Sequence, residues 1–277
     1  MTAQRLGGLI TGVPRSGTTL CCHVLNQQSN VVALHEPINP GGLAINAENA
    51  LELLSNKYVD FAKSIYEGTA FEHGNDSGLD IDNPVGLGIV DGKRAVTAKR
   101  GQIVVTKYIG KDIQLFVKQN ALFTAYLERL TPQFSITCIV RNPVDVLLSW
   151  WTVDLPVSRG RLPAGEKNDA HLKQALAQQN EELSRQLTIY QWFLAKYACN
   201  NVSVVRYEDI IATNGAALFK AAGVQQTLPL ALANKVRQYS PQIIERLQKV
   251  RSRLIEIDCK GLYSKEQIAK RIDGLIN

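Results

Sequence analysis

Short runs of apolar residues alternate with longer segments of helical periodicity along most of the chain. The runs that predict buried strands are residues 6–11, 31–34, 103–106, 134–140 and 202–205. The segments that predict helices are 18–28, 47–66, 115–130, 143–152 and 170–197, with mostly helical periodicity from residue 214 onward. This alternation is typical of a parallel sheet with helices on both faces. We therefore predict an α/β fold with three layers, α/β/α, in a single domain spanning residues 1–277.

Two long segments do not follow the alternation. Residues 71–102 and 153–168 are interrupted by glycine and proline. Connections longer than about 12–15 residues are uncommon in compact domains, and they often serve as binding loops or lids. The second segment follows a candidate anion-binding motif, so we predict that it covers a ligand. For the first segment, a binding loop and a surface insertion both stay open.

The composition excludes several classes of protein. Of 277 residues, 45% are hydrophobic and 20% are charged, so the chain can bury a large core and is not disordered, collagen-like or a coiled coil. Lys and Arg number 31 against 25 Asp and Glu, a net charge of +6. This modest excess suits an anionic ligand and is too diffuse to indicate nucleic acid.

Cysteine usage and hydropathy indicate the compartment. The five cysteines form no CxxC pair and have no metal-like spacing with the four histidines, so we expect free thiols, a reducing environment and no bound metal. No apolar run reaches the roughly 18 residues of a membrane span, and residues 1–6 do not resemble a signal peptide. We expect a cytoplasmic protein without membrane or nucleic-acid partners.

A glycine-containing loop follows the first predicted strand. Residues 12–19 read GVPRSGTT and lead directly into the first predicted helix. In such a loop the backbone N–H groups converge on one anion, and the helix N-terminus adds partial positive charge. The predicted ligand-binding residues are Pro14, Arg15, Ser16, Gly17, Thr18 and Thr19, with the two threonines as helix caps and hydroxyl donors.

This loop differs from the phosphate loop of ATPases and kinases at one position. The spacing fits GxxxxGK[ST], but Thr18 occupies the place of the lysine that bridges the β- and γ-phosphates. The cation is instead Arg15, inside the loop. The loop therefore favours an anionic ligand other than a nucleoside triphosphate.

A second anion-binding motif follows the predicted strand 134–140. Arg141 comes at the carboxyl edge of the sheet, where ligands bind in open α/β folds. Asn142 and Pro143 fit the N-cap and the first residue of the next helix. At about 1.5 Å per residue, Ser149 lies roughly 9 Å along that helix, within reach of an extended arginine. Arg141 and Ser149 are therefore predicted to hold one phosphate between them.

At these two motifs the chain resembles sulfotransferases that use 3′-phosphoadenosine 5′-phosphosulfate (PAPS). Residues 14–20 are similar to that family's 5′-phosphosulfate loop, and Arg141 with Ser149 is similar to its 3′-phosphate motif. Tyr207, in the run RYED at 206–209, is similar to the tyrosine that contacts adenine. The resemblance implies a P-loop-like phosphosulfate-binding loop, PAPS as co-substrate without a metal, and in-line sulfuryl transfer to a small-molecule acceptor.

Two neighbouring residues compete for the role of general base. His35 and Glu36 end the second predicted strand and are followed by Pro37. The Glu-Pro pair is similar to one that contributes a catalytic glutamate in bacterial and carbohydrate sulfotransferases. Glu36 would serve if burial raised its pKa toward neutrality, whereas the unperturbed pKa of His35 is already suitable. Neighbours on a strand point to opposite faces, so only one of them is expected to face the ligand.

Two further positions bear on the resemblance. Lys107, after the predicted strand 103–106, resembles a family lysine that stabilises the leaving oxygen, but Ile109 stands where cytosolic sulfotransferases have a catalytic histidine. The Arg-Lys-Gly-x-x-Gly segment that completes 3′-phosphate binding in cytosolic enzymes is also absent. Its candidate replacements are Lys249, Arg251 and Arg253, with a solvated helix face as the alternative.

The acceptor is the least constrained part of the prediction. The chain is similar to bacterial tailoring sulfotransferases of secondary metabolism, including the toxin-biosynthesis enzymes of cyanobacteria that sulfate guanidinium alkaloids of the saxitoxin type. The acceptor atom would be a hydroxyl oxygen or an amide or carbamoyl nitrogen. Acidic side chains such as Glu36, Asp154 and Glu166 would suit a cationic acceptor.

Two other functions compete with sulfuryl transfer. A P-loop-type kinase or nucleotide-binding protein needs an acidic magnesium ligand after a strand, and Glu208 with Asp209 is the feature that imitates one. A catalytically silent nucleotide-binding module would have no use for Arg15, Arg141 and the candidate bases together.

Overall fold

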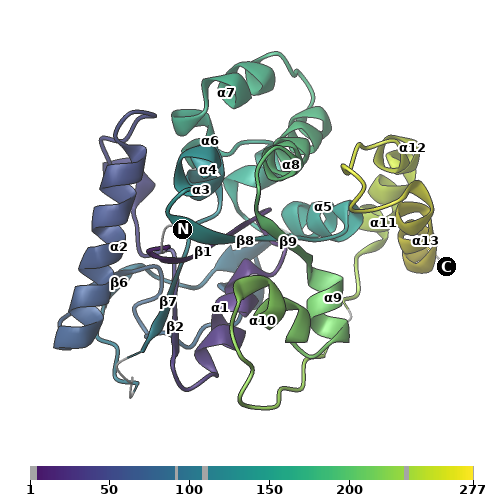
Figure 1. The fold of residues 1–277 in the computed structure, drawn as a ribbon. Coiled ribbons are helices and arrows are strands. Elements are labelled where there is room, and N and C mark those ends of the chain that lie inside the picture. Colours follow the sequence, from purple (N-terminus) through teal and green to yellow (C-terminus); the bar gives the residue numbers. More distant parts are fainter. Residues whose placement is uncertain (1–4, 91–92, 108–111, 234–236, 277) are drawn as a thin grey trace.

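Five parallel strands form the central sheet (Figure 1). The structure, a computed structural model, describes residues 5–90, 93–107, 112–233 and 237–276. In spatial order the strands are β2 (Val31–His35), β7 (Gln114–Lys118), β1 (Gly7–Gly12), β8 (Phe134–Val140) and β9 (Ser203–Arg206). Leu9 of β1 pairs with Val117 on one side and Ile136 on the other. The chain order reverses around β1, and such a switch point marks the ligand crevice in open α/β sheets.

Helices cover both faces of the sheet. Figure 1 shows α1 (Thr18–Asn26) and α10 (Ala216–Ala222) on one side, and α3 (Ala121–Ala125), α5 (Pro143–Trp151) and α8 (Glu182–Ala198) on the other. Side chains of the sheet alternate accordingly: Ile10 packs in the core beneath α1, and Leu9 packs in the larger core on the opposite face. The predicted three-layer α/β fold is confirmed.

The remaining helices extend these layers. They are α2 (Ala50–Glu67), α4 (Leu127–Leu130), α6 (Pro163–Asn168), α7 (Ala170–Ala177), α9 (Tyr207–Ala212), α11 (Pro241–Lys249), α12 (Arg251–Ile255) and α13 (Lys265–Ile276). The last three lie together beside α5 at the C-terminal end of the chain (Figure 1). None of the helices in the described residues is both long enough and apolar enough to span a membrane.

Four of the predicted strands match within one residue at each end, and the fifth is wrong. Residues 101–103 form β6 (Gly101–Ile103), which pairs antiparallel with β3 (Phe71–His73) outside the central sheet. The fifth central strand, β7, lies at the start of the predicted helix 115–130. Its apolar residues are buried, and a short continuous apolar run fits a buried strand as well as a buried helix.

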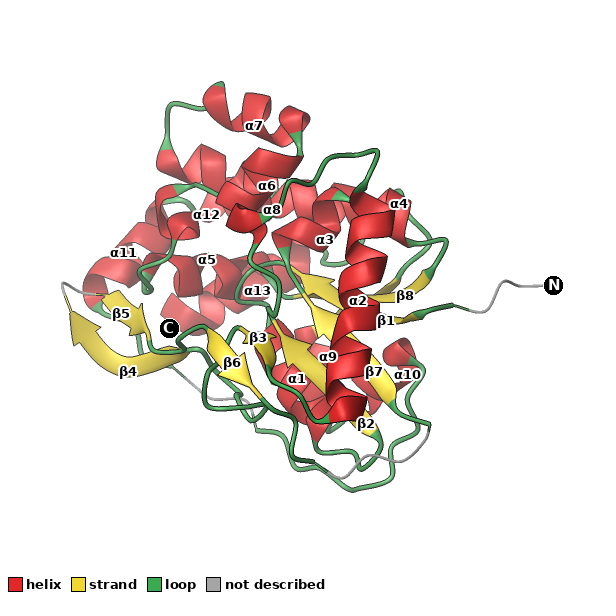
Figure 2. Cartoon of the chain, turned by 90° about the vertical axis from the view of Figure 1, so that its left-hand side faces the viewer, coloured by secondary structure: helices red, strands yellow, loops and turns green. Residues whose placement is uncertain are grey.

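The two irregular segments contact each other. Within 71–102, β4 (Val85–Val90) and β5 (Lys93–Val96) form a second antiparallel pair, visible at the side of the molecule in Figure 2. The backbone N–H of Arg94 donates to the Thr152 carbonyl, and the N–H of Asp154 donates to the Arg94 carbonyl, both at 3.0 Å. Residues 153–168 contain a 3₁₀ turn (Pro156–Arg159) and α6. That this segment acts as a lid stays a prediction.

Candidate active site

The carboxyl ends of all five central strands meet at one cavity. Lys118 ends β7, and Glu36, Arg141 and Tyr207 directly follow β2, β8 and β9, while β1 leads into the loop that carries Arg15. These residues line a cavity of about 790 Å³. Its basic lining residues are Arg15, Arg100, Lys118, Arg141, Arg161 and Arg237, and its acidic ones, within the described residues, are Glu36 and Asp82. The excess of positive charge suits an anionic ligand.

The loop after β1 has the backbone geometry of an anion cradle. Arg15 and Gly17 have φ angles of +72° and +94°, in the region that glycine adopts freely and other residues rarely. Such turns direct backbone N–H groups toward one point. Gly17 precedes α1 and no side chain caps the helix, so the predicted threonine cap is wrong. Thr18 and Thr19 line the cavity instead.

Pro14 and Ser16 anchor this loop to the layers around it. The indole Nε1 of Trp150 on α5 donates to the Pro14 carbonyl at 2.8 Å. The hydroxyl of Ser16 donates to the Ile139 carbonyl on β8 at 2.9 Å, and Ser16 is fully buried. The Ser16 side chain therefore fastens the loop to β8, away from the cavity.

Arg15 extends from the loop across the cavity wall. Its Nε donates to the hydroxyl of Ser149 at 3.2 Å, and its Nη2 donates to Asn83 Oδ1 at 3.1 Å. Both partners are neutral. Burial, and then the charges of Arg237, Arg94 and Arg141, lower the pKa of Arg15 to about 10. An anion bound here would relieve the repulsion among these cations.

Arg141 and Tyr207 continue the same wall. The guanidinium carbon of Arg141 lies 4.2 Å from the centre of the Tyr207 ring, and Nη2 lies 3.7 Å from Asp145 Oδ1. The Arg141 Nε is buried and has no hydrogen-bond partner among the described residues. A Cβ added at Gly17 would lie 2.5 Å from Tyr207 Cδ2, so the ring packs directly on the loop.

Both candidate magnesium ligands are engaged elsewhere. Glu208 accepts hydrogen bonds from the Asn142 backbone N–H at 3.0 Å and from the Tyr263 hydroxyl at 2.7 Å. The carboxylate of Asp209 accepts two hydrogen bonds from Arg206, at 2.7 and 2.8 Å. Neither acidic side chain lines the cavity. These contacts remove the feature that favoured a kinase.

Comparison with known proteins decides the family. The model of the sulfotransferase family matches residues 9–220, a stretch that includes the loop after β1, Arg141 and Tyr207. The chain belongs to the sulfotransferase family. It is therefore an enzyme that transfers sulfuryl groups. None of the curated proteins matches the sequence. Among solved structures, a sulfotransferase from Alicyclobacillus acidocaldarius is 15% identical with a TM-score of 0.45, and the match covers 99% of this chain and 96% of that one.

In this sulfotransferase an ion pair occupies the side of the cavity opposite Tyr207. Lys118 Nζ donates to Glu36 Oε1 at 2.6 Å; the Lys118 side chain is 2% exposed and that of Glu36 is 40% exposed. Burial raises the pKa of Glu36, but the Lys118 charge and hydrogen bond, with His35 and Arg100, outweigh it and lower the pKa to about 2. The predicted rise of this pKa toward neutrality is wrong for the free enzyme.

His35 lies buried beside the ion pair. Burial, and then the Lys118 charge, lower the pKa of His35 to about 3, so its ring is neutral at neutral pH. Its Nδ1 is buried and has no hydrogen-bond partner among the described residues. Both His35 and Glu36 line the cavity, contrary to the expectation that one of them would. The reason is that Glu36, with φ of +47°, has left the alternating geometry of the strand.

Lys107 lies at the opposite end of the sheet, and the structure contradicts its predicted catalytic role. Its ammonium donates to the carbonyls of Asn26, Gln28 and Val31, where α1 ends and β2 begins, and it does not line the cavity. The error follows from the misplaced strand, because residues 103–106 do not belong to the central sheet. Ile109 lies outside the described residues.

Lys118 is the cavity lysine that the sequence prediction missed. It is the last residue of β7 and carries its ammonium to the carboxyl edge of the sheet. The available signal was a lysine directly after the apolar run 115–117. Because that run was assigned to a helix, Lys118 had no predicted place at a strand end.

The C-terminal cations that were candidates for 3′-phosphate binding do not reach the cavity. Lys249 pairs with Glu245 at 2.6 Å, Arg251 with Asp273 at 3.0 Å, and Arg253 with Glu181 at 2.6 Å. The alternative of a solvated helix face therefore fits. Among the described residues, the C-terminal cation that lines the cavity is Arg237, which the prediction did not include.

Two of the three acidic residues predicted for a cationic acceptor also point elsewhere. Asp154 pairs with Arg159 at 2.8 Å, and Glu166 pairs with Arg161 at 2.7 Å. Neither carboxylate lines the cavity. Glu36 is the member of that set that does.

Proposed function

We propose that this sulfotransferase takes its sulfuryl group from PAPS. The observation that carries the proposal is the buried Nε of Arg141, which has no hydrogen-bond partner in the part of the chain that the structure describes and lies next to the Tyr207 ring and the loop after β1. A nucleotide with a phosphosulfate and a second phosphate offers the two anions and the aromatic face that these groups recognise. The loop residues that line the cavity, Pro14, Arg15, Gly17, Thr18 and Thr19, would hold the 5′-phosphosulfate. Arg141 would hold the 3′-phosphate, while Ser16 would fasten the loop to β8 and Ser149 would orient Arg15.

Apolar lining residues support the assignment of a nucleobase. Leu20, Ile211 and Leu232 line the same cavity as Tyr207, and Ile211 follows Tyr207 by one turn on α9. Ligand pockets that bind flat aromatic groups combine such apolar walls with a few fixed polar groups. Adenine would lie against the Tyr207 ring, on the side of the cavity that adjoins α1 and α9.

For the chemistry, we assign the general base to Glu36 and the stabilisation of the leaving oxygen to Lys118 and Arg15. The acceptor hydroxyl gives its proton to the Glu36 carboxylate as its oxygen forms a bond to sulfur. The bond from sulfur to the 5′-phosphate oxygen breaks, and its electron pair stays on that oxygen. Positioned cations stabilise such developing charge without reorganisation. His35, which is neutral, would contribute by packing against this pair.

The ion pair between Glu36 and Lys118 would open when the donor binds. A carboxylate with a pKa of about 2 is a weak base. The phosphosulfate gives Lys118 a second anion to pair with, and once Lys118 turns to it, the charge and hydrogen bond that lower the pKa of Glu36 weaken and this pKa rises. Donor binding would in this way prepare the base.

The acceptor side of the cavity favours a small apolar molecule that carries a hydroxyl. Of the apolar lining residues, Ile38 follows the Glu36 turn, and Leu122, Leu155, Val157 and Leu162 come from α3 and the segment 153–168. A guanidinium alkaloid of the saxitoxin type is a cation, and it would meet more arginines than carboxylates on the described lining. We therefore propose a neutral acceptor ahead of a cationic one, with an oxygen rather than a nitrogen as the acceptor atom.

We further propose that residues 1–277 work as one domain, because the C-terminal helices brace the donor side. Arg271 on α13 donates to Asp145 Oδ1 at 2.6 Å and to Oδ2 at 3.0 Å. Asp145 in turn lies against Arg141. The C-terminal region therefore reaches the proposed 3′-phosphate site through one shared carboxylate.

A transfer assay with three matched phenols tests the donor and the acceptor class together. PAPS labelled with ³⁵S is offered with 4-ethylphenol, tyramine or 4-hydroxyphenylacetate, with magnesium or with EDTA. We expect transfer to 4-ethylphenol in EDTA, with a lower kcat/KM for the cationic tyramine. A preference for tyramine would restore the cationic acceptor. No transfer to any phenol, together with magnesium-dependent phosphorylation from ATP, would contradict the proposed function.

A further inference from the structure

Glu36 has a backbone conformation that its own sequence does not favour. Its φ of +47° is in the left-handed region, which residues with a Cβ rarely adopt. It also precedes Pro37, whose ring restricts the residue before it. A strained turn persists only when surrounding residues hold it, so contacts from outside β2 must hold this one. The orientation of the proposed base depends on these contacts.

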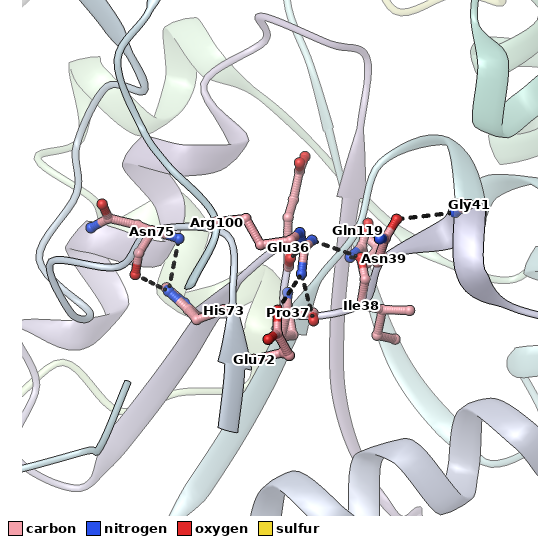
Figure 3. A network of polar contacts seen from close by, with 10 residues as sticks. All are labelled: Glu36, Pro37, Ile38, Asn39, Gly41, Glu72, His73, Asn75, Arg100 and Gln119. Carbon is pink, nitrogen blue, oxygen red and sulfur yellow. Dashed lines mark hydrogen bonds and ion pairs between the residues drawn. The ribbon is translucent and has the colours of Figure 1, made fainter. Parts of the chain in front are cut away.

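The side chain of Arg100 binds the backbone of this turn. Its guanidinium donates to three successive carbonyls, those of Glu36 at 2.5 Å, Pro37 at 3.0 Å and Ile38 at 3.0 Å (Figure 3). Three carbonyls can face one planar group when the chain curves around it. A fixed fork of donors is the chemical group that suits such an arrangement.

The strand pair β3 and β6 carries Arg100 and a second contact to the same turn. His73 on β3 pairs with Gly101 on β6, the residue after Arg100. His73 Nε2 accepts from the backbone N–H of His35 at 2.8 Å, and the N–H of Gly74 donates to the His35 carbonyl at 2.9 Å. The two strands thus hold the peptide groups on both sides of Glu36.

Two backbone N–H groups approach the His73 ring, that of His35 at Nε2 (2.8 Å) and that of Asn75 at Nδ1 (3.2 Å), and we assign the ring proton from the shorter contact. Because Nε2 accepts from His35, the proton of the neutral ring is on Nδ1, which lies 2.9 Å from the Asn75 carbonyl. Burial lowers the pKa of His73, which keeps the ring neutral and the acceptor available. Figure 3 shows the His73 ring in contact with Asn75, and Arg100 in contact with the turn that contains Glu36.

We propose that Arg100 is a positioning residue for sulfuryl transfer, which holds the Glu36 turn so that the carboxylate faces Lys118 and the acceptor. This inference rests on the proposed role of Glu36. It also gives a function to the segment 71–102, which the sequence left open between a binding loop and a surface insertion. Because Arg100 lines the cavity, the competing role is direct binding of the acceptor.

Lys107 provides a matched control. It is also a cation that donates to three backbone carbonyls, at distances of 2.8 Å for Asn26 and Val31, with Gln28 as the third. These hydrogen bonds lie at the other end of the sheet, away from the cavity. We therefore expect loss of the Lys107 side chain to lower the stability of the fold, as loss of the Arg100 side chain does, without displacing Glu36.

The test compares Arg100→Ala, Arg100→Lys and Lys107→Ala in the full chain, with PAPS and 4-ethylphenol as substrates. We expect Arg100→Ala to lower kcat by about 10- to 100-fold and to leave the KM for 4-ethylphenol and the binding of 3′,5′-adenosine bisphosphate nearly unchanged. Arg100→Lys should recover part of the kcat, and Lys107→Ala should keep kcat while lowering the melting temperature. A raised KM with unchanged kcat in Arg100→Ala, or equal losses of kcat in Arg100→Ala and Lys107→Ala, would overturn the proposal.

Gly74→Ala tests the same turn from the other side if Arg100→Ala does not fold. A Cβ there would lie 2.5 Å from the His35 carbonyl oxygen and 3.1 Å from Glu36 Cβ, so the turn must shift. We expect a lower kcat with donor binding kept, and full kcat would overturn the proposal. Glu36→Gln tests the proposed function separately from the role of Arg100. If that variant keeps full kcat, Glu36 is not the general base, whatever the Arg100 variants do.

Discussion

The two sides of the cavity differ in how their residues are assembled. The donor side is built from contiguous motifs: residues 14–19 follow β1, Arg141 follows β8, and Tyr207 follows β9. On the acceptor side, a strand-end position alone does not define the role of Glu36: its pKa depends on pairing with Lys118, 82 positions away, and its turn is held by Arg100, next to a strand pair outside the central sheet. Binding of a common donor can be encoded locally, whereas the placement of the base depends on the whole fold.

The largest expected effect is on the acceptor side. Glu36→Gln removes the proposed base and should lower kcat by about 10²- to 10⁴-fold, the range attributed to general base catalysis. Binding of 3′,5′-adenosine bisphosphate should be kept, and it serves as the measure of folded protein. Asp154→Asn is the matched control, because that carboxylate pairs with Arg159 and does not line the cavity. Equal kcat values for Glu36→Gln and Asp154→Asn would contradict the role of Glu36 as the base on the acceptor side.

The next effect concerns the contact between the loop and Tyr207 on the donor side. Gly17→Ala combines a backbone penalty at φ of +94° with a Cβ that would lie 2.5 Å from Tyr207. We expect bisphosphate binding to weaken on the order of tenfold and the free energy of unfolding to fall by about 1–2 kcal/mol. Gly223→Ala, at φ of +68° with no atom of the described residues within 4 Å of the added Cβ, should lose similar stability and keep its affinity. Loss of affinity in both variants would show that Tyr207 is not involved.

A smaller effect is expected in acid. The pKa of Glu36, about 2, lies below the ordinary value near 4.3, so the folded state binds this proton less tightly than the unfolded chain does. The ion pair with Lys118 therefore stabilises the fold fully above the ordinary pKa, and this contribution is lost as pH falls from about 4.5 toward 2. Urea unfolding of the wild type and Glu36→Gln from pH 6 to pH 3 measures it. The difference in unfolding free energy should shrink as pH falls, and a constant difference would contradict the pairing.

The smallest effect should come from Glu208, which contacts the backbone next to Arg141 on the donor side without lining the cavity. Glu208→Gln keeps the shape of the side chain but weakens its hydrogen bonds to the Asn142 backbone and the Tyr263 hydroxyl. We expect a few-fold weaker bisphosphate affinity, since each hydrogen bond to a charged group contributes only about 1.5–3 kcal/mol and the glutamine replaces part of it. Asp209→Asn, which affects the pair with Arg206 outside the cavity, is the control. Calorimetry on both variants checks the prediction.

The donor side could be predicted because its signals are local. A strand, a glycine loop and a helix in sequence fix the cradle around Arg15, and Arg141 and Tyr207 each come at a strand end. Even there, one detail was wrong: the cap of α1 is Gly17 rather than a threonine. Arg237 was missed because it comes from residues 223–240, where no described residue is helical and only tertiary packing brings the chain to the cavity.

The acceptor side could be predicted only in part, for a physical reason. Glu36 was found from its place after β2, but its pKa depends on Lys118, and Lys118 directly follows an apolar run that suits a helix as well as a strand. Lys107 was chosen instead because its preceding residues also resemble a strand. The contacts of Arg100 with the Glu36 turn join residues more than 60 positions apart, and no spacing in the sequence encodes them.

Calorimetric titration with 3′,5′-adenosine bisphosphate tests the central claim most directly. The wild type, Arg141→Ala and the control Arg251→Ala are titrated in EDTA, alongside ATP with and without magnesium. The account predicts tight bisphosphate binding without metal, a loss of about 10- to 100-fold in Arg141→Ala, and unchanged affinity in Arg251→Ala. Magnesium-dependent ATP binding with no response to the bisphosphate, or equal affinity in all three proteins, would contradict it.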